Sequence, residues 1–461
     1  MFNIKQVYQP AFYEAMSLLF MIMAIISTMI IFVGTVPHIP VIVSIFVLIL
    51  FGLMKRVPYT SLEKGLVDGA KSGISAVFIF FMIGLLISAW LLSGTILSLM
   101  DTAFFFVSPG FFYGAVFLTA SLIGLFIGSS LTTVATIGVA LVGVASAMDA
   151  SAAITAGAVV SGAFFGDKMS PLSDTTNLAA SIAGVDLFVH IQNMAWTTVP
   201  AFLLSLAGFA ALSPDLDGSS FQDVQQIRDT IQEMGFIHWY SWLPALMLVI
   251  LSIRRVPPLL TLAASTAFAT GLSFFHSGKS IADTAAVLFA GFVPDTGNAE
   301  VDALLSRGGL DSMMFTVSLI LLSLSLGGLL FTLGVIPCLF EGIERKLTTA
   351  GHSIAATAAT AMGINVIIGE QYLSILLTGE AFSHHFEKLG LVKKNLSRTL
   401  EDAGTVVNPL VPWSVCGVFI ADVLGVPVTD YFFFAFFCLV SPLLTVLYGY
   451  TGWTISKENR S

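Results

Sequence analysis

Charge is scarce in this sequence, and that scarcity excludes a soluble globular protein. Of the 461 residues, 56% are hydrophobic and only 10% are charged, whereas an average soluble domain carries about 25% charged residues. Several stretches contain no Asp, Glu, Lys or Arg, and each can hold the roughly 20 apolar residues of a membrane-crossing helix. These stretches are residues 15–54, 72–100, 102–148, 312–340 and 431–456. The sequence therefore predicts a multi-span integral membrane protein.

Basic residues, cysteines and enzyme motifs are also few or missing. The 19 Lys and Arg residues against 28 Asp and Glu residues give a net charge of −9, so no basic surface for nucleic acid is expected. Cys338, Cys416 and Cys438 lie in apolar stretches without metal-binding or disulfide spacing. No P-loop, nucleophile elbow or metalloprotease helix occurs. We therefore expect no nucleic-acid partner, no cofactor and no enzymatic activity.

The apolar runs and the basic loops predict how the chain crosses the membrane. Because Lys and Arg gather on the cytoplasmic side, both chain ends are expected inside and the acidic connection 214–233 outside. Spans are expected at residues 11–33, 38–54, 74–98, 111–130, 187–211, 312–338 and 431–451, with 242–253 joined to 257–276 in one more. The basic residues expected on the cytoplasmic side are Lys5, Lys55, Arg56, Lys64, Lys71, Arg254, Arg255, Arg345, Lys346, Lys388, Lys393, Lys394, Arg398, Lys457 and Arg460.

Two apolar segments, residues 128–186 and 350–425, are crowded with Gly, Ala, Ser and Thr. Small residues let helices approach closely, and hydroxyls with flexible backbone suit places where a helix breaks and lines a cavity. Such interrupted segments at matching places in two halves point to a transporter binding site near the middle of the membrane.

The two segments also resemble each other in sequence. Gly166–Leu172 can be laid on Gly404–Leu410, an offset of 404 − 166 = 238, and each follows a Gly-polar pair, Gly128-Ser129 or Gly369-Glu370. This correspondence predicts an internal repeat. Similar composition of small-residue membrane segments would give part of the same likeness.

The densest polar cluster in an apolar setting lies between residues 166 and 177. Sodium, like other hard cations, prefers carboxylate, hydroxyl, amide and backbone oxygens. Pro171 cannot continue a helix ladder and so favours a break at which carbonyls turn inward. The alternative is an ordinary loop in which Ser173 or Asp174 caps the next helix. The candidate ion ligands here are Asp167, Ser170, Ser173, Asp174, Thr175, Thr176 and Asn177.

A second cluster follows Gly369. Glu370 lies between apolar stretches, where a carboxylate costs at least about 2.5 kcal/mol, so a functional role is the default expectation. The alternative is a residue at a helix end near the membrane surface. Removal from water favours a protonated carboxylate and a bound cation favours the ionised one, which allows one group to exchange a proton for sodium.

Further along, Asn408-Pro409 repeats the oxygen-bearing side chain at a helix break seen at Ser170-Pro171. Glu401 and Asp402 have the alternative of capping the helix that follows. The candidate ion ligands of the second half are Glu370, Asp402, Thr405 and Asn408.

Together the two clusters resemble the NhaC family of bacterial sodium/proton antiporters, which also contains a sodium-lactate/malate-proton exchanger. The resemblance rests on GDKMSPLSDTTN, from Gly166, and SRTLEDAGTVVNPLVPWSVCG, from Ser397, and extends over roughly residues 60–450. Membership of this family and of its ion-transporter superfamily implies an all-α membrane protein made of two inverted repeats. It also implies scaffold and transport domains, re-entrant hairpins, broken helices and a homodimer.

Carried onto this chain, the resemblance implies a division into five parts. The hairpin tips and helix breaks would fall near Gly128–Thr133, Asp167–Asn177, Gly369–Gln371 and Thr405–Pro412. The parts are scaffold helices at 1–100 and 242–345, transport segments with a re-entrant hairpin at 101–211 and 346–461, and an external acidic loop at 212–241.

The tip sequence departs from that of the superfamily's carboxylate carriers, which have Ser-Asn-Thr where this chain has Ser173-Asp174-Thr175. An added carboxylate favours a bare cation and a proton over an anionic substrate. We therefore expect an elevator-type antiporter that exchanges Na⁺ for H⁺ across the bacterial cytoplasmic membrane. Its Na⁺ is expected at Asp174, Asn177 and Asn408, and its protons at Asp174, Glu370 and Asp167.

Two other transport functions stay open. A sodium- and proton-coupled exchanger of small carboxylates such as malate or lactate would need a cationic partner for its substrate, and Lys168 is the obvious candidate. A passive cation channel would need a continuous polar pore, against which the carboxylates in small-residue segments argue.

Overall fold

The chain folds into helices in the computed structural model, which describes residues 4, 6–106, 109–213, 228–276, 278–298, 301–302, 305–344 and 347–457. Over these ranges there is no β-strand, and only two isolated bridges join extended residues. Helices satisfy their own backbone hydrogen bonds, as the core of a bilayer requires. The all-α prediction is therefore confirmed. Most of the acidic connection 214–233 and the basic residues Lys5, Arg345, Lys346 and Arg460 lie outside the described residues.

The first half of the chain runs from the N-terminal helices to a long helix, α11. Its elements are α1 (Phe12–Ser27), η1 (Thr28–Phe32), α2 (His38–Met54), α3 (Tyr59–Ser72), α4 (Ile74–Leu92), α5 (Thr95–Phe106), η2 (Pro109–Phe111), α6 (Phe112–Ile127), α7 (Ser130–Thr133), η3 (Val134–Gly138), α8 (Val139–Ala147), α9 (Ala152–Met169), α10 (Asp174–Ala183) and α11 (Leu187–Leu212).

The second half ends in the C-terminal helix α24. Its elements are η4 (Trp239–Trp242), α13 (Leu243–Ile253), α14 (Pro258–Ser273), α15 (Ile281–Ala290), α17 (Met313–Thr332), α18 (Val335–Glu344), α19 (Ala350–Ile368), α20 (Gln371–Lys388), α21 (Lys393–Leu400), η5 (Glu401–Thr405), η6 (Asn408–Leu410), α22 (Val415–Leu424), α23 (Val428–Tyr431), η7 (Phe432–Phe434) and α24 (Phe436–Thr451).

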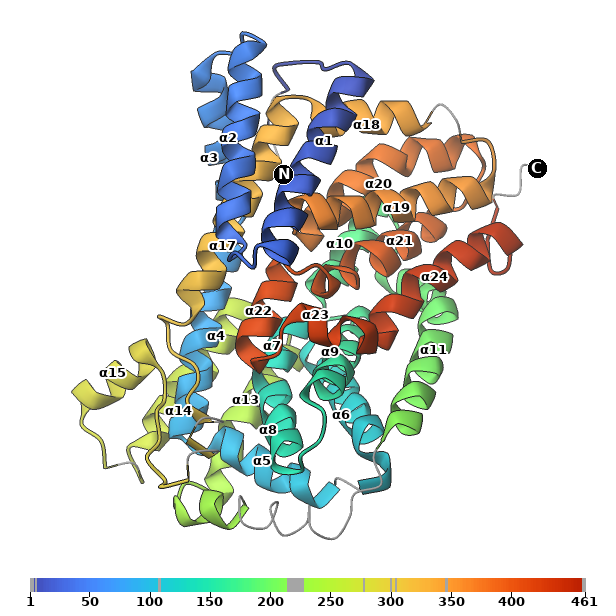
Figure 1. Ribbon diagram of the computed structural model, residues 1–461. Helices are drawn as coiled ribbons and strands as arrows, with labels where there is room; N and C mark the ends of the chain where they lie inside the picture. Colours follow the sequence, from blue (N-terminus) through green and yellow to red (C-terminus); the bar gives the residue numbers. More distant parts are fainter. Residues whose placement is uncertain are drawn as a thin grey trace.

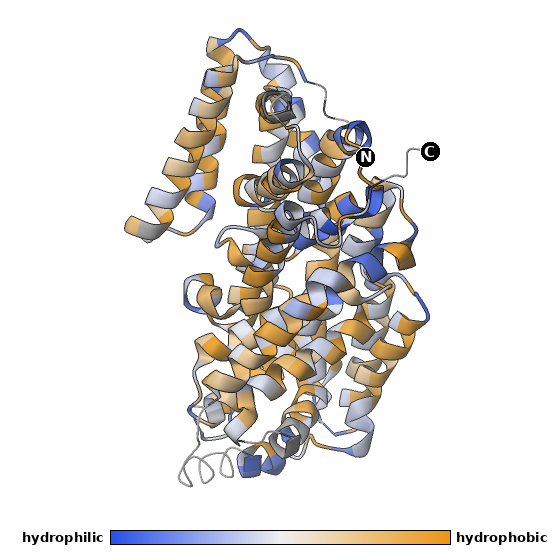
Figure 2. Ribbon diagram, turned by 90° about the vertical axis from the view of Figure 1, so that its right-hand side faces the viewer, coloured by the Kyte–Doolittle hydropathy of each residue, from blue (hydrophilic) through white to orange (hydrophobic). Residues whose placement is uncertain are grey.

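Several of these helices are long and apolar enough to cross a membrane. Four qualify singly, and three further pairs qualify when each pair bent at a short break counts as one span, which gives up to seven. Figure 2 shows predominantly hydrophobic helices along the molecule, with hydrophilic residues gathered mainly at turns and helix ends. The single helices are Phe12–Ile30, Leu187–Leu212, Met313–Thr332 and Ala350–Ile368. The protein is a multi-pass membrane protein.

Two sequence-based expectations about the spans are wrong. Residues 242–276 do not form one joined span, because α13 and α14 are separate helices that pack against each other across a turn with Arg255 at φ +58°. The supposed loop with Lys64 and Lys71 is helical: α3 buries Leu62, Gly65 and Gly69. This helix packs along α17, where glycines allow the close approach.

The predicted breaks are confirmed, and they fall at corresponding places in the two halves. α6 and α19 both end at a left-handed glycine, Gly128 (φ +69°) and Gly369 (φ +75°), 369 − 128 = 241 positions apart. The same offset relates the capping residues Ser129 and Glu370, Ser151 and Val392, Ser173 and Ser414, Gly184 and Gly425, and Asp186 and Pro427.

These helix ends follow an offset of 241 residues, not the 238 expected from the Gly166 and Gly404 match, and the internal repeat itself stays a prediction. That match reflected composition, since Gly166 lies in the regular helix α9 and Gly404 in the π-helical turn η5. At an offset of 241, Asp167 corresponds to Asn408. The prolines at the two breaks, Pro171 and Pro412, are separated by the same offset.

The two halves interlock around the breaks. α10 packs on α20 and α21 of the second half, and α22 packs on η3, α7 and α8 of the first. In Figure 1, α7, α9, α10 and α22 meet in the middle of the molecule, with α6 and α8 below them and α19 and α20 above. This is an arrangement that inverted repeats would produce. The division into scaffold and transport parts stays a prediction.

Close packing of α6 and α9 holds the first break in place, and a substitution tests its importance. A Cβ at Gly166 would lie 2.5 Å from Leu125 N and 2.6 Å from Ser121 O, both backbone atoms that cannot yield. We expect Gly166→Ala to separate the two helices, displace the neighbouring Asp167 and cut ion transport severely. Gly363→Ala is the matched control, because its Cβ meets nothing within 4 Å and alanine favours a helix by roughly 0.5–1 kcal/mol. Thermal melting and transport by both purified variants check the expectation, and wild-type transport by Gly166→Ala would contradict it.

Candidate ion-binding site

The break between α9 and α10 brings polar side chains into the middle of the protein. Ser170 ends α9, and its Oγ accepts a hydrogen bond from Leu172 N at 3.2 Å. Ser173 caps α10 by accepting from Thr176 N at 3.3 Å, and Thr176 Oγ1 donates to the Lys168 carbonyl at 3.1 Å. The hydroxyls of Ser170, Ser173 and Thr176 thus stabilise the break itself. Capping by Ser173 is confirmed, and these three hydroxyl residues are buried, whereas Asp174 and Asn177 of the same segment are exposed.

Asp167 faces the tip of the first hairpin. Its carboxylate is 4% exposed, and Oδ2 accepts a hydrogen bond from Ser130 N at 3.0 Å, the first residue of α7. The hydroxyls of Ser130 and Ser173 lie beside the same carboxylate. An anionic side chain at a helix N-terminus is favoured by the orphan N–H groups and the helix dipole. The left-handed Gly128 provides the tight turn that aims this N-terminus at Asp167.

Glu401 is a buried carboxylate of the second broken helix. It is fully buried, and Thr175 of α10 donates its hydroxyl hydrogen to Oε1 at 3.1 Å. The Thr405 hydroxyl also lies within hydrogen-bonding reach of this carboxylate. Asp167 is close enough to act electrostatically on Glu401.

The capping interpretation of Glu401 and Asp402 is wrong, because both lie inside the π-helical turn η5, which continues α21. Successive residues on a helix point about 100° apart, so the two carboxylates face different neighbours. Asp402 is fully buried and forms an ion pair with Lys168. It also accepts hydrogen bonds from Thr197 at 2.8 Å and from Thr445. Asp402 is thus already neutralised by a cation of the protein.

Asn408 shapes the second break. Its Nδ2 donates to Asn365 Oδ1 at 2.9 Å, and its Oδ1 accepts from Cys416 N at 3.0 Å. Asn365 in turn donates to the Gly404 carbonyl at 2.6 Å. With its amide satisfied on both sides, Asn408 holds η6 and the start of α22 together.

Glu370 and Asp174 line a larger cavity. Glu370 caps α20 by accepting a hydrogen bond from Leu373 N at 2.7 Å, as the helix-end alternative expects. It also faces a cavity of about 890 Å³ that Asp174 shares. The opposite wall includes Lys64, Asp68 and Lys71 of α3 with apolar side chains between. These contacts give Glu370 and Asp174 access to a chamber rather than to a closed site.

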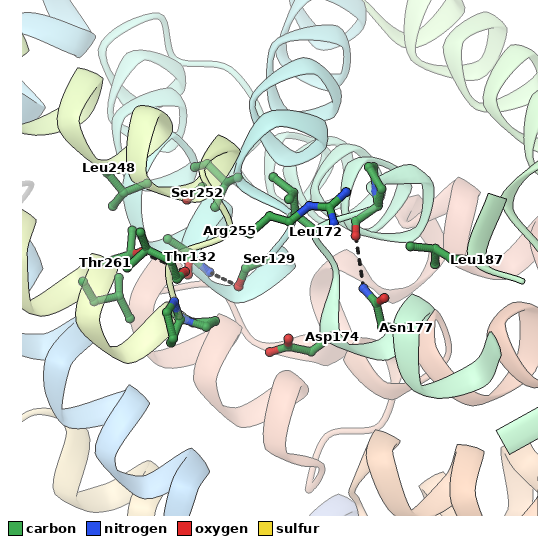
Figure 3. Close-up of a pocket in the computed structure, with 17 residues that line it drawn as sticks. Ser129, Thr132, Leu172, Asp174, Asn177, Leu187, Leu248, Ser252, Arg255 and Thr261 are labelled. Atoms are coloured by element: carbon green, nitrogen blue, oxygen red, sulfur yellow. Dashed lines mark hydrogen bonds between the residues drawn. The ribbon is translucent and has the colours of Figure 1, made fainter. Parts of the chain in front are cut away.

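Asp174 also lines a second cavity, of about 290 Å³, between α10, the tip at Ser129 and the α13–α14 turn. Figure 3 shows the Asp174 carboxylate pointing into this space below Ser129, and Arg255 extending towards Leu172. Asn177 is exposed here, and its Nδ2 donates to the Pro171 and Ser173 carbonyls at 3.1 and 2.6 Å. Asn408 lines neither cavity. The structure therefore does not bring together Asp174, Asn177 and Asn408.

The structure gathers one part of the predicted ligand set and adds to it. Thr175 and Thr405 contact Glu401, and Asp167 lies near it with Ser173 beside Asp167. The sequence favoured a capping role for Glu401. The sequence signal that could have indicated its place in the site is the adjacent acidic pair Glu401-Asp402. Neighbouring residues on a helix point in different directions, so the two carboxylates must have different partners. Arg255, expected in a cytoplasmic loop, lines the same cavity as Asp174.

A multi-pass membrane protein whose broken helices meet at buried carboxylates is a secondary transporter of ions or small solutes. The model of the Na⁺/H⁺ antiporter family matches residues 162–453. The chain is 44% identical to the Na⁺/H⁺ antiporter NhaC of Alkalihalophilus pseudofirmus, with 96% of each chain covered. It is 40% identical to NhaC of Bacillus subtilis, over 95% of this chain and 97% of the relative. It therefore belongs to the Na⁺/H⁺ antiporter family.

A more distant relative is the malate-2H⁺/Na⁺-lactate antiporter of Bacillus subtilis, which is 30% identical over 97% of this chain and 96% of its own length. The resemblance to the NhaC family seen in the two sequence motifs is confirmed. All three relatives are named as antiporters.

Proposed function

We propose that this protein exchanges Na⁺ for H⁺ across the cytoplasmic membrane, with Glu401 as the central group for which the two cations compete. The observation that carries the proposal is the fully buried carboxylate of Glu401, which lies close to Asp167, Thr175 and Thr405. Family membership and the names of the most similar relatives support Na⁺ and H⁺ as the transported ions.

Competition at one carboxylate provides the coupling. A buried ionised carboxylate without a counter-charge is strongly disfavoured, so Glu401 is stable either with a proton or with a bound cation. Na⁺ prefers oxygen ligands, and the oxygens close to Glu401 include those of Asp167, Ser173 and Thr175. Because the empty, charged site is costly to move, one cation must replace the other before the site crosses the membrane.

Access to the site is proposed through the two cavities that Asp174 lines. Asp174 and Glu370 carry negative charge into the larger cavity, where they attract cations and exchange protons with water. The movement between the two membrane sides is proposed to be of the elevator type, and the protein to be a homodimer, as its family resemblance implies. The interlocked hairpins and broken helices support a unit that moves as one body.

The test is a proteoliposome assay with an internal pH dye. NaCl is added first, and malate or lactate afterwards, to either side of the membrane. A proton flux triggered by Na⁺ alone, absent from protein-free liposomes and unchanged by the organic acids, is expected. A flux that requires a carboxylate would instead identify an organic-acid exchanger, and the absence of any flux would reject both functions.

Organic-acid exchange is the second candidate, and Arg255 is the observation that favours it. A carboxylate substrate needs a cationic partner. Lys168 cannot serve freely because Asp402 neutralises it, whereas Arg255 is exposed in the cavity that contains Asp174. The relative named as a malate/lactate antiporter belongs to this candidate.

Arg255→Gln separates the two candidates. If Na⁺ and H⁺ are the only substrates, we expect the variant to retain Na⁺-driven proton flux close to the wild-type rate. The reason is that Arg255 is itself positively charged and therefore does not bind Na⁺. Arg254→Gln, on the same turn, is the control. Loss of flux in Arg255→Gln alone, together with dependence on malate or lactate, would favour the organic-acid exchanger.

A further inference from the structure

The Lys168–Asp402 ion pair is built like an occupied cation site. Lys168 and Asp402 are both fully buried, and their charged groups are in direct contact. The Lys168 ammonium also donates to Ser441 Oγ at 3.1 Å and lies 5.5 Å from the centre of the Phe437 ring. An ammonium is a compact monovalent cation, so it stands where a small metal cation would stand.

The oxygens around this ion pair come from three elements. Asp402 is in η5, and three hydroxyls, those of Thr197 in α11 and of Ser441 and Thr445 in α24, point to its carboxylate. The ammonium itself contacts Asp402 Oδ1 and Ser441 Oγ, while Thr197 and Thr445 donate to Asp402 Oδ2. Carboxylate and hydroxyl oxygens are the ligands that a hard cation prefers. If the lysine head group were removed, the Asp402 carboxylate would be left without a counter-charge, in a position where a cation could bind.

A buried ion pair contributes little to stability compared with well-packed apolar residues of similar volume, so stability alone does not account for this pair. The pair also lies on the other side of η5 from Glu401 and Thr175, so two cation positions flank a single π-helical turn.

We propose that the Lys168 ammonium is a tethered cation that fills a second cation site at Asp402 and thereby limits the protein to one bound Na⁺. The proposal rests on the proposed function, in which the first Na⁺ binds at Glu401. It assigns Lys168 a role in setting how many ions are bound and moved. It predicts that removing the ammonium opens the second site to Na⁺.

Equilibrium binding of ²²Na⁺ to the purified full-length protein, at alkaline pH where the carboxylates are ionised, tests this role. We expect one Na⁺ per wild-type chain and two per Lys168→Met chain, with the initial transport rate changing from a hyperbolic to a sigmoidal dependence on Na⁺. Lys168→Arg keeps a cation in place and is expected to bind one. Lys168→Met/Asp402→Asn, which removes the second site again, is also expected to bind one.

The Na⁺ stoichiometry distinguishes failure of the proposed function from failure of the tethered-cation proposal. No Na⁺ bound by the wild type would reject the proposed function itself. One Na⁺ in the wild type and still one in folded Lys168→Met would overturn the tethered-cation proposal alone. Should the methionine variant fail to fold, Lys168→Gln, whose amide still donates to Asp402, replaces it with the same expectation of two Na⁺ and the same contrary result of one.

Discussion

Replacement of Glu401 by glutamine is expected to reduce Na⁺-driven proton flux to the level of protein-free liposomes. Glutamine has nearly the shape of glutamate and keeps an oxygen to accept the hydrogen bond from Thr175, so the fold should survive. It has no titratable proton and no charge, and it therefore removes both forms of the group for which Na⁺ and H⁺ compete. Flux through reconstituted protein and direct Na⁺ binding are the measurements.

The matched control for this variant is Glu380→Gln. Glu380 lies on the neighbouring helix α20 but is exposed, so the same chemical change should leave transport unaltered. Thermal melting of both proteins shows whether any loss is due to misfolding. A folded Glu401→Gln protein with more than half of the wild-type flux and unchanged Na⁺ affinity would remove Glu401 from the centre of the mechanism and direct attention to Asp174 and Glu370.

Local sequence signals predicted the breaks well because their causes are local. A glycine that takes a left-handed conformation ends a helix, a proline cannot continue one, and a serine hydroxyl caps the next. Gly128, Gly369, Pro171 and Ser173 act in this way in the structure. The apolar composition predicted the membrane setting for an equally direct reason, since every backbone polar group there must be paired inside a helix.

The composition of the ion site could not be predicted in the same way, because it depends on contacts between distant parts of the chain. Thr175 meets Glu401 over 226 positions, and Lys168 meets Asp402 over 234. Which of several polar residues on a broken helix faces which partner depends on the helix register. An offset of 238 aligns Asp167 with Thr405, whereas the offset of 241 seen in the helix ends aligns it with Asn408.

A lone polar residue in a membrane segment also leaves its role open until its partner is known. Asn408 and Asp402 both looked like ligands for sodium, yet one joins Asn365 and Cys416 and the other is paired with Lys168. Conversely, Glu401 looked like a cap and is a fully buried carboxylate that contacts Thr175 and Thr405. Burial and hydrogen-bond satisfaction separate these roles, and neither can be read from one residue's sequence neighbours.

Asp402→Asn is expected to cause the largest loss of stability among single substitutions in this region. It leaves the fully buried Lys168 ammonium without a counter-charge, and breaking a buried pair by removing one partner costs about 3–5 kcal/mol. Asparagine keeps one oxygen for Thr197 or Thr445, so the loss is due to charge rather than to shape. Asp68→Asn is the control, since its pair with Lys71 spans 3.4 Å and is partly exposed, and such pairs contribute only about 0–1 kcal/mol.

Sodium should distinguish the two ways of breaking this pair. Lys168→Met leaves a carboxylate that Na⁺ can neutralise, so added NaCl should raise its melting temperature more than that of the wild type. Asp402→Asn leaves an ammonium that repels Na⁺, so NaCl should restore nothing at this position. The double variant Lys168→Met/Asp402→Leu, with both charges gone, should recover much of the stability without Na⁺. If NaCl stabilised Asp402→Asn as strongly as Lys168→Met, the ion would act elsewhere, and the charge balance at Asp402 would not explain the stability of either variant.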